Sequence, residues 1–209
     1  AGDVTTLSVV GTSLTNNAAG QDGGGIWISG DSQLQVTDST SFGFNRAGGA
    51  AIGQGGGAIF SDGGDLDISL ATFTDNEAFG AAGSGGAIFS GAGGQLTVVE
   101  STLLRNQANR AGGAIEVGVG QTATLMDTDL IQNVAGIDPP SPDSPGNGGG
   151  LHLSGDAGAT IMGGTFEDNV AASEGGGIWN GAGVLTVTST LADRAIIRGN
   201  TALGTLADQ

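Results

Sequence analysis

The sequence predicts an all-β protein, a parallel β-helix in which one short motif repeats along the chain. Three observations lead to this prediction. A glycine pair followed by a small residue and Ile or Leu occurs six times, an Asn with an apolar residue three positions before it occurs seven times, and alternating apolar segments accompany them. No window has helical periodicity, and glycine, at 43 of 209 residues, disfavours helix.

The glycine motifs lie 27 to 36 residues apart: Gly23–Ile26, Gly56–Ile59, Gly85–Ile88, Gly112–Ile115, Gly148–Leu151 and Gly175–Ile178. A glycine pair at the same point of every repeat indicates a tight turn. We expect its backbone to adopt a conformation that other residues avoid.

The alternating segments predict strands with one buried and one solvated face. Each has a polar residue between two apolar ones: Leu7/Val9, Leu34/Val36, Leu66/Ile68, Leu96/Val98, Ala123/Leu125, Ala159/Ile161 and Leu185/Val187. In five copies the first apolar residue lies ten positions before the Asn, so the register is fixed on this side. Length varies mainly between the Asn and the next Ile or Leu, which predicts that the loops lie along one edge.

The repeated asparagines predict a ladder of buried side-chain amides in a tight turn, hydrogen-bonded from coil to coil. Its members are Asn17, Asn45, Asn76, Asn106, Asn133, Asn169 and Asn200. A repeat of about 27 residues with three short strands fits one turn of a β-helix, whose turns share a core by stacking. The chain is therefore predicted to form one domain, residues 1–209, of about seven turns with no helices of note.

The charge of the chain limits its partners. With 21 carboxylates against five cations, all arginine, its net charge is −16, which disfavours nucleic acid and acidic membrane surfaces. No apolar run approaches the length of a membrane span, so no membrane insertion is expected within this chain.

The two signatures together resemble the Gly-Gly-Ala-Ile and Phe-x-x-Asn repeats of the chlamydial polymorphic outer-membrane proteins and related bacterial surface proteins. The strict copies are Gly56–Ile59, Gly85–Ile88 and Gly112–Ile115, with Phe42–Asn45, Phe73–Asn76 and Phe166–Asn169. This resemblance implies a right-handed, pectin-lyase-like parallel β-helix displayed outside the cell, often in adhesion. The expected location is therefore extracellular or at the cell surface.

Two pairs of side chains are expected to meet between adjacent turns. Asp75 and Arg105, each just before a ladder asparagine, are expected to form an exposed ion pair. His152 follows Leu151 in a column predicted to point outward, one turn from Glu116, and a solvated His–Glu contact is expected there.

Three carboxylates near one turn, Asp62, Asp65 and Asp67, are the kind of ligands that calcium prefers. The alternative interpretation is a polar turn entering a strand. No cofactor other than this possible Ca²⁺ is expected.

An aromatic stripe from three consecutive turns, Trp27, Phe60 and Phe89, is the predicted binding surface. Two outcomes are open: the stripe contacts sugar rings or a partner, or the long loops after the asparagines fold over it. The loops expected to carry recognition are 46–55, 77–84 and 134–147.

The sequence favours a non-enzymatic extracellular structural or adhesive rod, because no catalytic constellation follows from its diffuse charges. Its partners would be other copies of itself, stacked head to tail into a filament, or other surface proteins and glycans. The tail after Asn200 and the head before Leu7 together have the length of one connection, although a segment of a longer solenoid would look the same. The alternative function is a carbohydrate-active β-helix, either an enzyme of the polysaccharide lyase or glycosidase kind or a carbohydrate-binding module.

Overall fold

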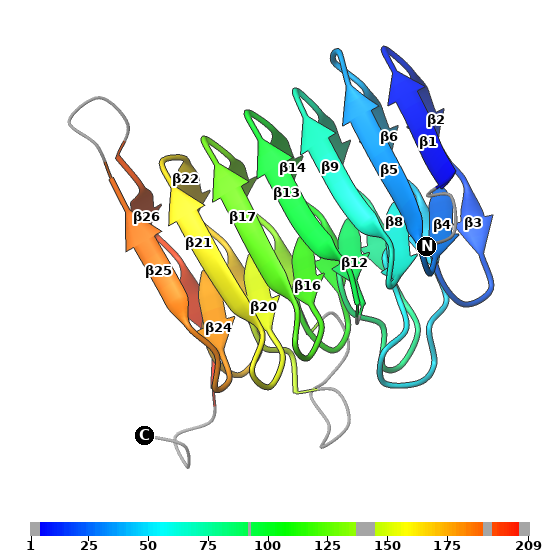
Figure 1. Ribbon diagram of the computed structural model, residues 1–209. Coiled ribbons are helices and arrows are strands. Elements are labelled where there is room, and N and C mark those ends of the chain that lie inside the picture. The colour runs from blue at the N-terminus through cyan, green and yellow to red at the C-terminus, as the bar shows by residue number, and fades with distance from the viewer. Residues whose placement is uncertain (1–4, 92, 137–144, 190–193, 205–209) are drawn as a thin grey trace.

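The computed structural model describes residues 5–91, 93–136, 145–189 and 194–204. In these ranges the chain is an all-β solenoid whose coils stack side by side from the N-terminal to the C-terminal end (Figure 1). Every strand pairs in parallel with the equivalent strand of the next coil, so the predicted parallel β-helix is confirmed. The described residues contain no helix, and hence none that could cross a membrane.

Four parallel sheets run the length of the solenoid. Sheet A contains β1 (Thr5–Val10), β5 (Ser32–Thr37), β9 (Asp65–Ser69), β13 (Gln95–Val99), β17 (Thr122–Met126), β21 (Gly158–Met162) and β25 (Leu185–Thr188). Sheet B contains β2 (Ser13–Thr15), β6 (Ser41–Gly43), β10 (Thr72–Thr74), β14 (Thr102–Leu104), β18 (Asp129–Ile131), β22 (Thr165–Glu167) and β26 (Ile196–Arg198).

The two remaining sheets complete each coil. Sheet C contains β3 (Ala18–Ala19), β7 (Arg46–Ala47), β11 (Glu77–Ala78), β15 (Gln107–Ala108), β19 (Val134–Ala135), β23 (Val170–Ala171) and β27 (Thr201–Ala202). Sheet D contains β4 (Ile26–Ser29), β8 (Ile59–Asp62), β12 (Ile88–Ser90), β16 (Ile115–Val117), β20 (Leu151–Leu153) and β24 (Ile178–Asn180).

Each complete coil therefore has four strands, and the predicted three is wrong. The strand that was not predicted is the two-residue strand of sheet C, which is too short to show an alternating pattern. The solenoid has about six turns, because sheet D has six strands and the other sheets each gain a seventh from a partial first coil.

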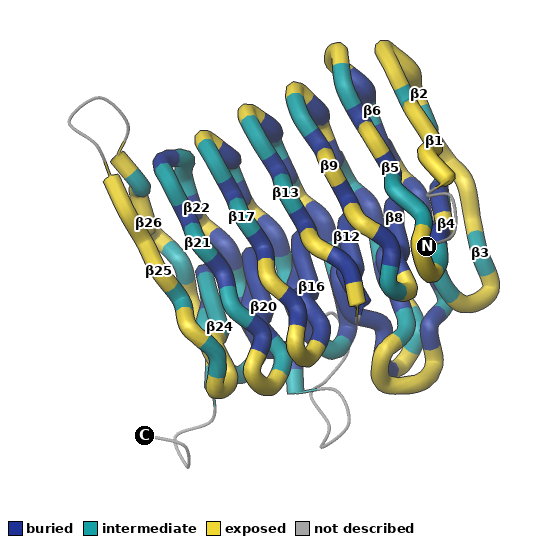
Figure 2. The backbone as a smooth tube through the Cα atoms, in the orientation of Figure 1, coloured by how far each residue is buried: buried dark blue, intermediate teal, exposed yellow. Residues whose placement is uncertain are grey.

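The core is built from columns of like side chains in register. Leu66 pairs with Leu96, and Ile68 with Val98, and all four are at most 1% exposed. Phe42 and Phe73 stack in the neighbouring column, with ring centroids 4.7 Å apart and planes 1° from parallel. The middle coils combine buried stretches with exposed tips and outward positions, whereas the two end coils are largely exposed (Figure 2).

The seven asparagines lie at the corner between sheets B and C, joined from coil to coil. Asn106 donates from its backbone N and its Nδ2 to Oδ1 of Asn133, at 2.8 and 3.0 Å, and its Nδ2 also donates to the carbonyl oxygen of Phe73. Asn76 makes the same pair of bonds to Asn106. The corner is sharp because the residue before each asparagine has positive φ, for example 53° at Arg105.

The glycine pairs form the turn that leads into sheet D, and each member of a pair has its own reason. Gly85 has a φ of +66°, which side-chain-bearing residues rarely adopt. Gly86 has an ordinary φ, but a Cβ there would lie 2.1 Å from the carbonyl oxygen of Gly113 in the next coil. The turn therefore needs glycine once for conformation and once for close packing.

Candidate binding site

The side chains that follow the inward Ile or Leu of sheet D form a column across the coils: Trp27, Phe60, Phe89, Glu116, His152 and Trp179. This column was predicted to point outward, with a solvated contact between His152 and Glu116 and with the aromatic members either exposed or covered by loops. Four of its members are instead buried, with Phe60 and Phe89 each 6% exposed, Glu116 1% and His152 4%. Trp27, at 52%, is the exposed member of the predicted aromatic stripe.

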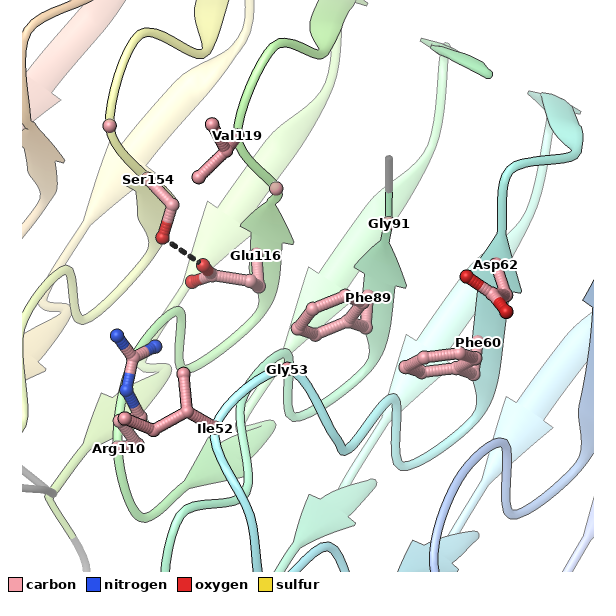
Figure 3. Close-up of a pocket in the computed structure, with 12 residues that line it drawn as sticks. Ile52, Gly53, Phe60, Asp62, Phe89, Gly91, Arg110, Glu116, Val119 and Ser154 are labelled. Carbon is pink, nitrogen blue, oxygen red and sulfur yellow. Dashed lines mark hydrogen bonds between the residues drawn. The ribbon is translucent and has the colours of Figure 1, made fainter. Parts of the chain in front are cut away.

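Two contacts explain why the outward-facing rings are buried. Phe60 and Phe89 stack on each other with centroids 4.9 Å apart, which covers one face of each ring. The loop that carries Ile52 and Gly53 passes beside both rings and borders the same hollow (Figure 3). Of the two outcomes left open by the sequence, covering therefore applies to Phe60 and Phe89, and exposure to Trp27.

The covering loop leaves a pocket of about 460 Å³ beside the stacked rings. It is lined by Ile52, Gly53, Phe60, Asp62, Phe89, Gly91, Arg110, Glu116, Gly118, Val119, Ser154 and Gly155. A cavity of this size, with apolar walls and a few polar groups, has the character of a small-molecule site.

Glu116 is the most buried charged group of this site. Its Oε1 accepts a hydrogen bond from the Ser154 hydroxyl at 2.6 Å, and its Oε2 lies 2.8 Å from Nδ1 of His152. Oε2 has no hydrogen bond of good geometry despite that close approach. The predicted meeting of Glu116 and His152 is correct, but the contact is buried rather than solvated, because the His152 ring also stacks on Trp179 at 4.4 Å.

The Ser154, His152 and Glu116 group differs from a nucleophilic triad. In a triad the serine and the acid contact opposite ring nitrogens of the histidine, so that the ring carries a proton between them. Here Ser154 and Glu116 both lie next to Nδ1, at 3.5 and 2.8 Å, and Ser154 donates directly to the carboxylate. The arrangement therefore fixes Glu116 in place instead of activating Ser154.

Arg110 brings a positive charge to the same end of the pocket, where Figure 3 shows it near Glu116 and Ser154. Its Nη1 donates to the Ser84 hydroxyl at 3.3 Å. No described carboxylate lies within ion-pair distance of it. No sequence pattern points to this residue, because Arg110 precedes the glycine motif in a segment without periodicity.

The three aspartates considered for calcium do not form a cluster. Asp62 borders the pocket, whereas Asp65 accepts from the backbone N of Gln95 and Asp67 from Nε2 of Gln33 on sheet A. In the described part of the chain, no three His, Cys, Asp or Glu side chains are grouped so that they could hold a metal ion. The structure gives the calcium prediction no support.

Of the loops expected to carry recognition, 46–55 borders the pocket through Ile52 and Gly53. Loop 77–84 contributes Ser84, the partner of Arg110. Residues 137–144 of loop 134–147 lie outside the described residues.

The exposed ion pair predicted between Asp75 and Arg105 is present, with Nη2 and Oδ2 2.8 Å apart. Similar pairs join neighbouring coils at Arg46 with Glu77 and at Arg198 with Glu167. These contacts line the outside of the ladder corner, away from the pocket.

Comparison with known families supports the resemblance over one repeat. Residues 163–181 match the Chlamydia polymorphic membrane protein (Chlamydia_PMP) repeat, a segment that contains Phe166, Asn169 and the glycine motif at Gly175. No curated protein matches the chain, and no solved structure matches it. The repeat and the parallel solenoid together fit a surface or structural β-helix protein, and this family supports a cell-surface location.

Proposed function

We propose that this chain is a non-enzymatic structural rod outside the cell that stacks head to tail into filaments. The observation that carries the proposal is the direction of the asparagine ladder. Each asparagine donates to the Oδ1 of the next one, and no described residue accepts from the backbone N–H of the last member, Asn200. At the other end, no described residue donates to Oδ1 of Asn17. In a head-to-tail stack, the N–H donor of Asn200 in one copy would therefore face the Oδ1 acceptor of Asn17 in the next copy.

The apolar columns support the same contact. Inward-facing positions that are buried in the middle coils are exposed at the two ends, where Leu7 is 45%, Val187 45% and Ile197 50% exposed. Strands β1 and β25 are the outermost strands of sheet A, and no strand of the described residues pairs with their outer edges. Stacking of copies would pair these edges and cover the apolar side chains, as a heterologous contact that need not close.

The test is the assembly state of the purified chain at rising concentration, by sedimentation velocity and negative-stain electron microscopy. Filaments are expected for the wild type and for Val119→Lys, which changes an exposed side chain far from both ends. Ile197→Lys should remove them, because it places a charge within the stacking surface. A monodisperse wild-type monomer at the highest concentration would rule out self-stacking.

Adhesion is the second part of the proposal, and it rests on Trp27. This side chain is half exposed on sheet D, and exposed aromatic surface commonly marks a contact site. Surface proteins and glycans are the expected partners. Binding of the labelled chain to a glycan array and to cells should weaken with Trp27→Ala and persist with Leu70→Ala, an equally exposed control.

The proposed absence of catalysis is tested separately. Turnover assays on pectin, alginate and related polymers are expected to give no product. Release of unsaturated or reducing ends that disappears in Glu116→Gln would favour the carbohydrate-active alternative.

A further inference from the structure

The pocket on sheet D has an uneven distribution of charge, which restricts what it can bind. Figure 3 shows Arg110, Glu116 and Ser154 at one end, the rings of Phe89 and Phe60 in the middle, and Asp62 at the far end. Arg110 and Glu116 both border the cavity, yet they do not form an ion pair with each other. A positive and a negative group therefore face the same end of an apolar chamber.

Glu116 is the group that points most directly to a ligand. Its side chain is 2% exposed, and removing a carboxylate from water is costly unless its oxygens are satisfied. Ser154 donates to Oε1, and Nδ1 of His152 lies 2.8 Å from Oε2 without a well-aligned hydrogen bond. Glu116 borders the pocket, so a ligand ammonium group there would place a positive charge beside its carboxylate.

We infer that the pocket binds a free α-amino acid with an apolar side chain. The ammonium group would bond to Glu116, and the carboxylate to the guanidinium of Arg110, which offers several donors to a carboxylate. The two head groups of an α-amino acid are adjacent, as are these two residues in the pocket. The apolar side chain would lie along Phe89, Phe60 and Ile52.

Other ligand chemistries use fewer of these groups. A simple amine would place its positive charge beside Arg110 with no group to pair with the guanidinium. A simple acid would likewise place its negative charge beside the carboxylate of Glu116. A sugar commonly stacks on an exposed aromatic face, whereas Phe60 and Phe89 turn faces toward each other and are 94% buried. This inference stands apart from stacking and adhesion, which involve the ends of the solenoid and Trp27.

The experiment is isothermal titration calorimetry of the full chain with L-leucine and three comparison ligands. These are isoamylamine, which lacks the carboxylate, 4-methylpentanoate, which lacks the amine, and cellobiose. L-leucine is expected to bind at least about tenfold more tightly than each of them, because one charged contact is worth a tenfold change or more. Tighter binding of the amine, the acid or the sugar would overturn the inference, and so would no heat with L-leucine.

Variants then assign the contacts. Arg110→Gln and Glu116→Gln are each expected to weaken L-leucine binding at least about tenfold. Arg105→Gln is the matched control, since it removes an exposed arginine at the ladder corner, just after β14, and should leave the affinity unchanged. If Glu116→Gln does not fold, Ile52→Asp replaces it, because Ile52 is 64% exposed and the change places a negative charge on the apolar wall. Unchanged affinity in both Arg110→Gln and the second variant would contradict the assignment.

Discussion

The corner between sheets B and C repeats the same residue in every described coil, whereas the outer face of sheet D carries a different side chain in most of them. At the corner between sheets B and C, every described coil places an asparagine, and the amide of each one before Asn200 donates to the asparagine of the next coil. On the outer face of sheet D, the equivalent positions hold Trp27, Phe60, Phe89, Glu116, His152 and Trp179. The repeated corner and the four parallel sheets keep the coils in register, whereas the side chains on the outer face of sheet D differ from coil to coil.

The largest difference is expected between two phenylalanines, one from each environment. Phe73 is fully buried in the core and stacks on Phe42, so Phe73→Ala should lower the free energy of unfolding by about 4 kcal/mol. Phe89 stacks on Phe60 but borders an existing pocket, and its truncation should cost about half as much. Urea denaturation measures both, and equal losses would show that the sheet D face is as tightly packed as the core.

The ladder corner itself is tested by Asn106→Ala, for which we expect a loss of about 3 kcal/mol. The substitution leaves the backbone N–H and Nδ2 of Asn76 without their acceptor, and the carbonyl oxygen of Phe73 without its donor, inside a fully buried site. Gln107→Ala, one residue further along, removes no ladder bond and serves as the control. Equal effects of the two substitutions on urea unfolding would contradict the ladder's role in stability.

A smaller effect is expected just before the ladder. Arg105→Gln breaks the ion pair with Asp75, but both side chains are partly exposed and solvent screens their attraction. Hydrogen bonding to Asp75 raises the pKa of Arg105, which favours the charged guanidinium. The melting temperature should hardly change, and any change should vanish in 1 M salt. A loss as large as that of Asn106→Ala would mean that the outside of the corner also holds the coils together.

The smallest effect concerns Asp22, whose Oδ1 accepts from the backbone N of Gly55 at the end of the covering loop. Burial raises the pKa of Asp22, the bond from Gly55 lowers it, and the charge of Asp62 raises it again. Because the folded pKa exceeds the unfolded value of 3.8, the folded state binds the proton more tightly. Stability from this group therefore increases as pH falls through the folded pKa, and is lost as pH rises through it.

Asp22→Asn removes this dependence and keeps an oxygen for Gly55. The variant should melt slightly above the wild type at pH 7, with the difference shrinking as the pH falls toward 4. Thermal unfolding of both proteins across that range measures it. A difference that grows on acidification would show that the carboxylate is stabilised rather than destabilised in the folded protein.

The sequence by itself determined the parallel β-helix, the inward columns and the ladder corner. These features are periodic, and each repeat carries the same local signal: an alternating strand, an asparagine and a glycine pair. The local pattern did not predict the two-residue strand of sheet C, such as β15 at Gln107–Ala108, because two residues are too few to show alternation.

Only the tertiary structure decided what happens on the outer face of sheet D. Alternation places Phe60, Phe89, Glu116 and His152 outside the coil, and nothing in the repeat says whether a loop will cover them. Their burial arises from contacts between different coils: ring on ring, Ser154 and His152 on Glu116, and the loop at Ile52 beside the aromatic pair. A pocket made in this way depends on segments far apart in the chain, so its polar end, with Arg110 near Glu116, emerges only once the coils are stacked.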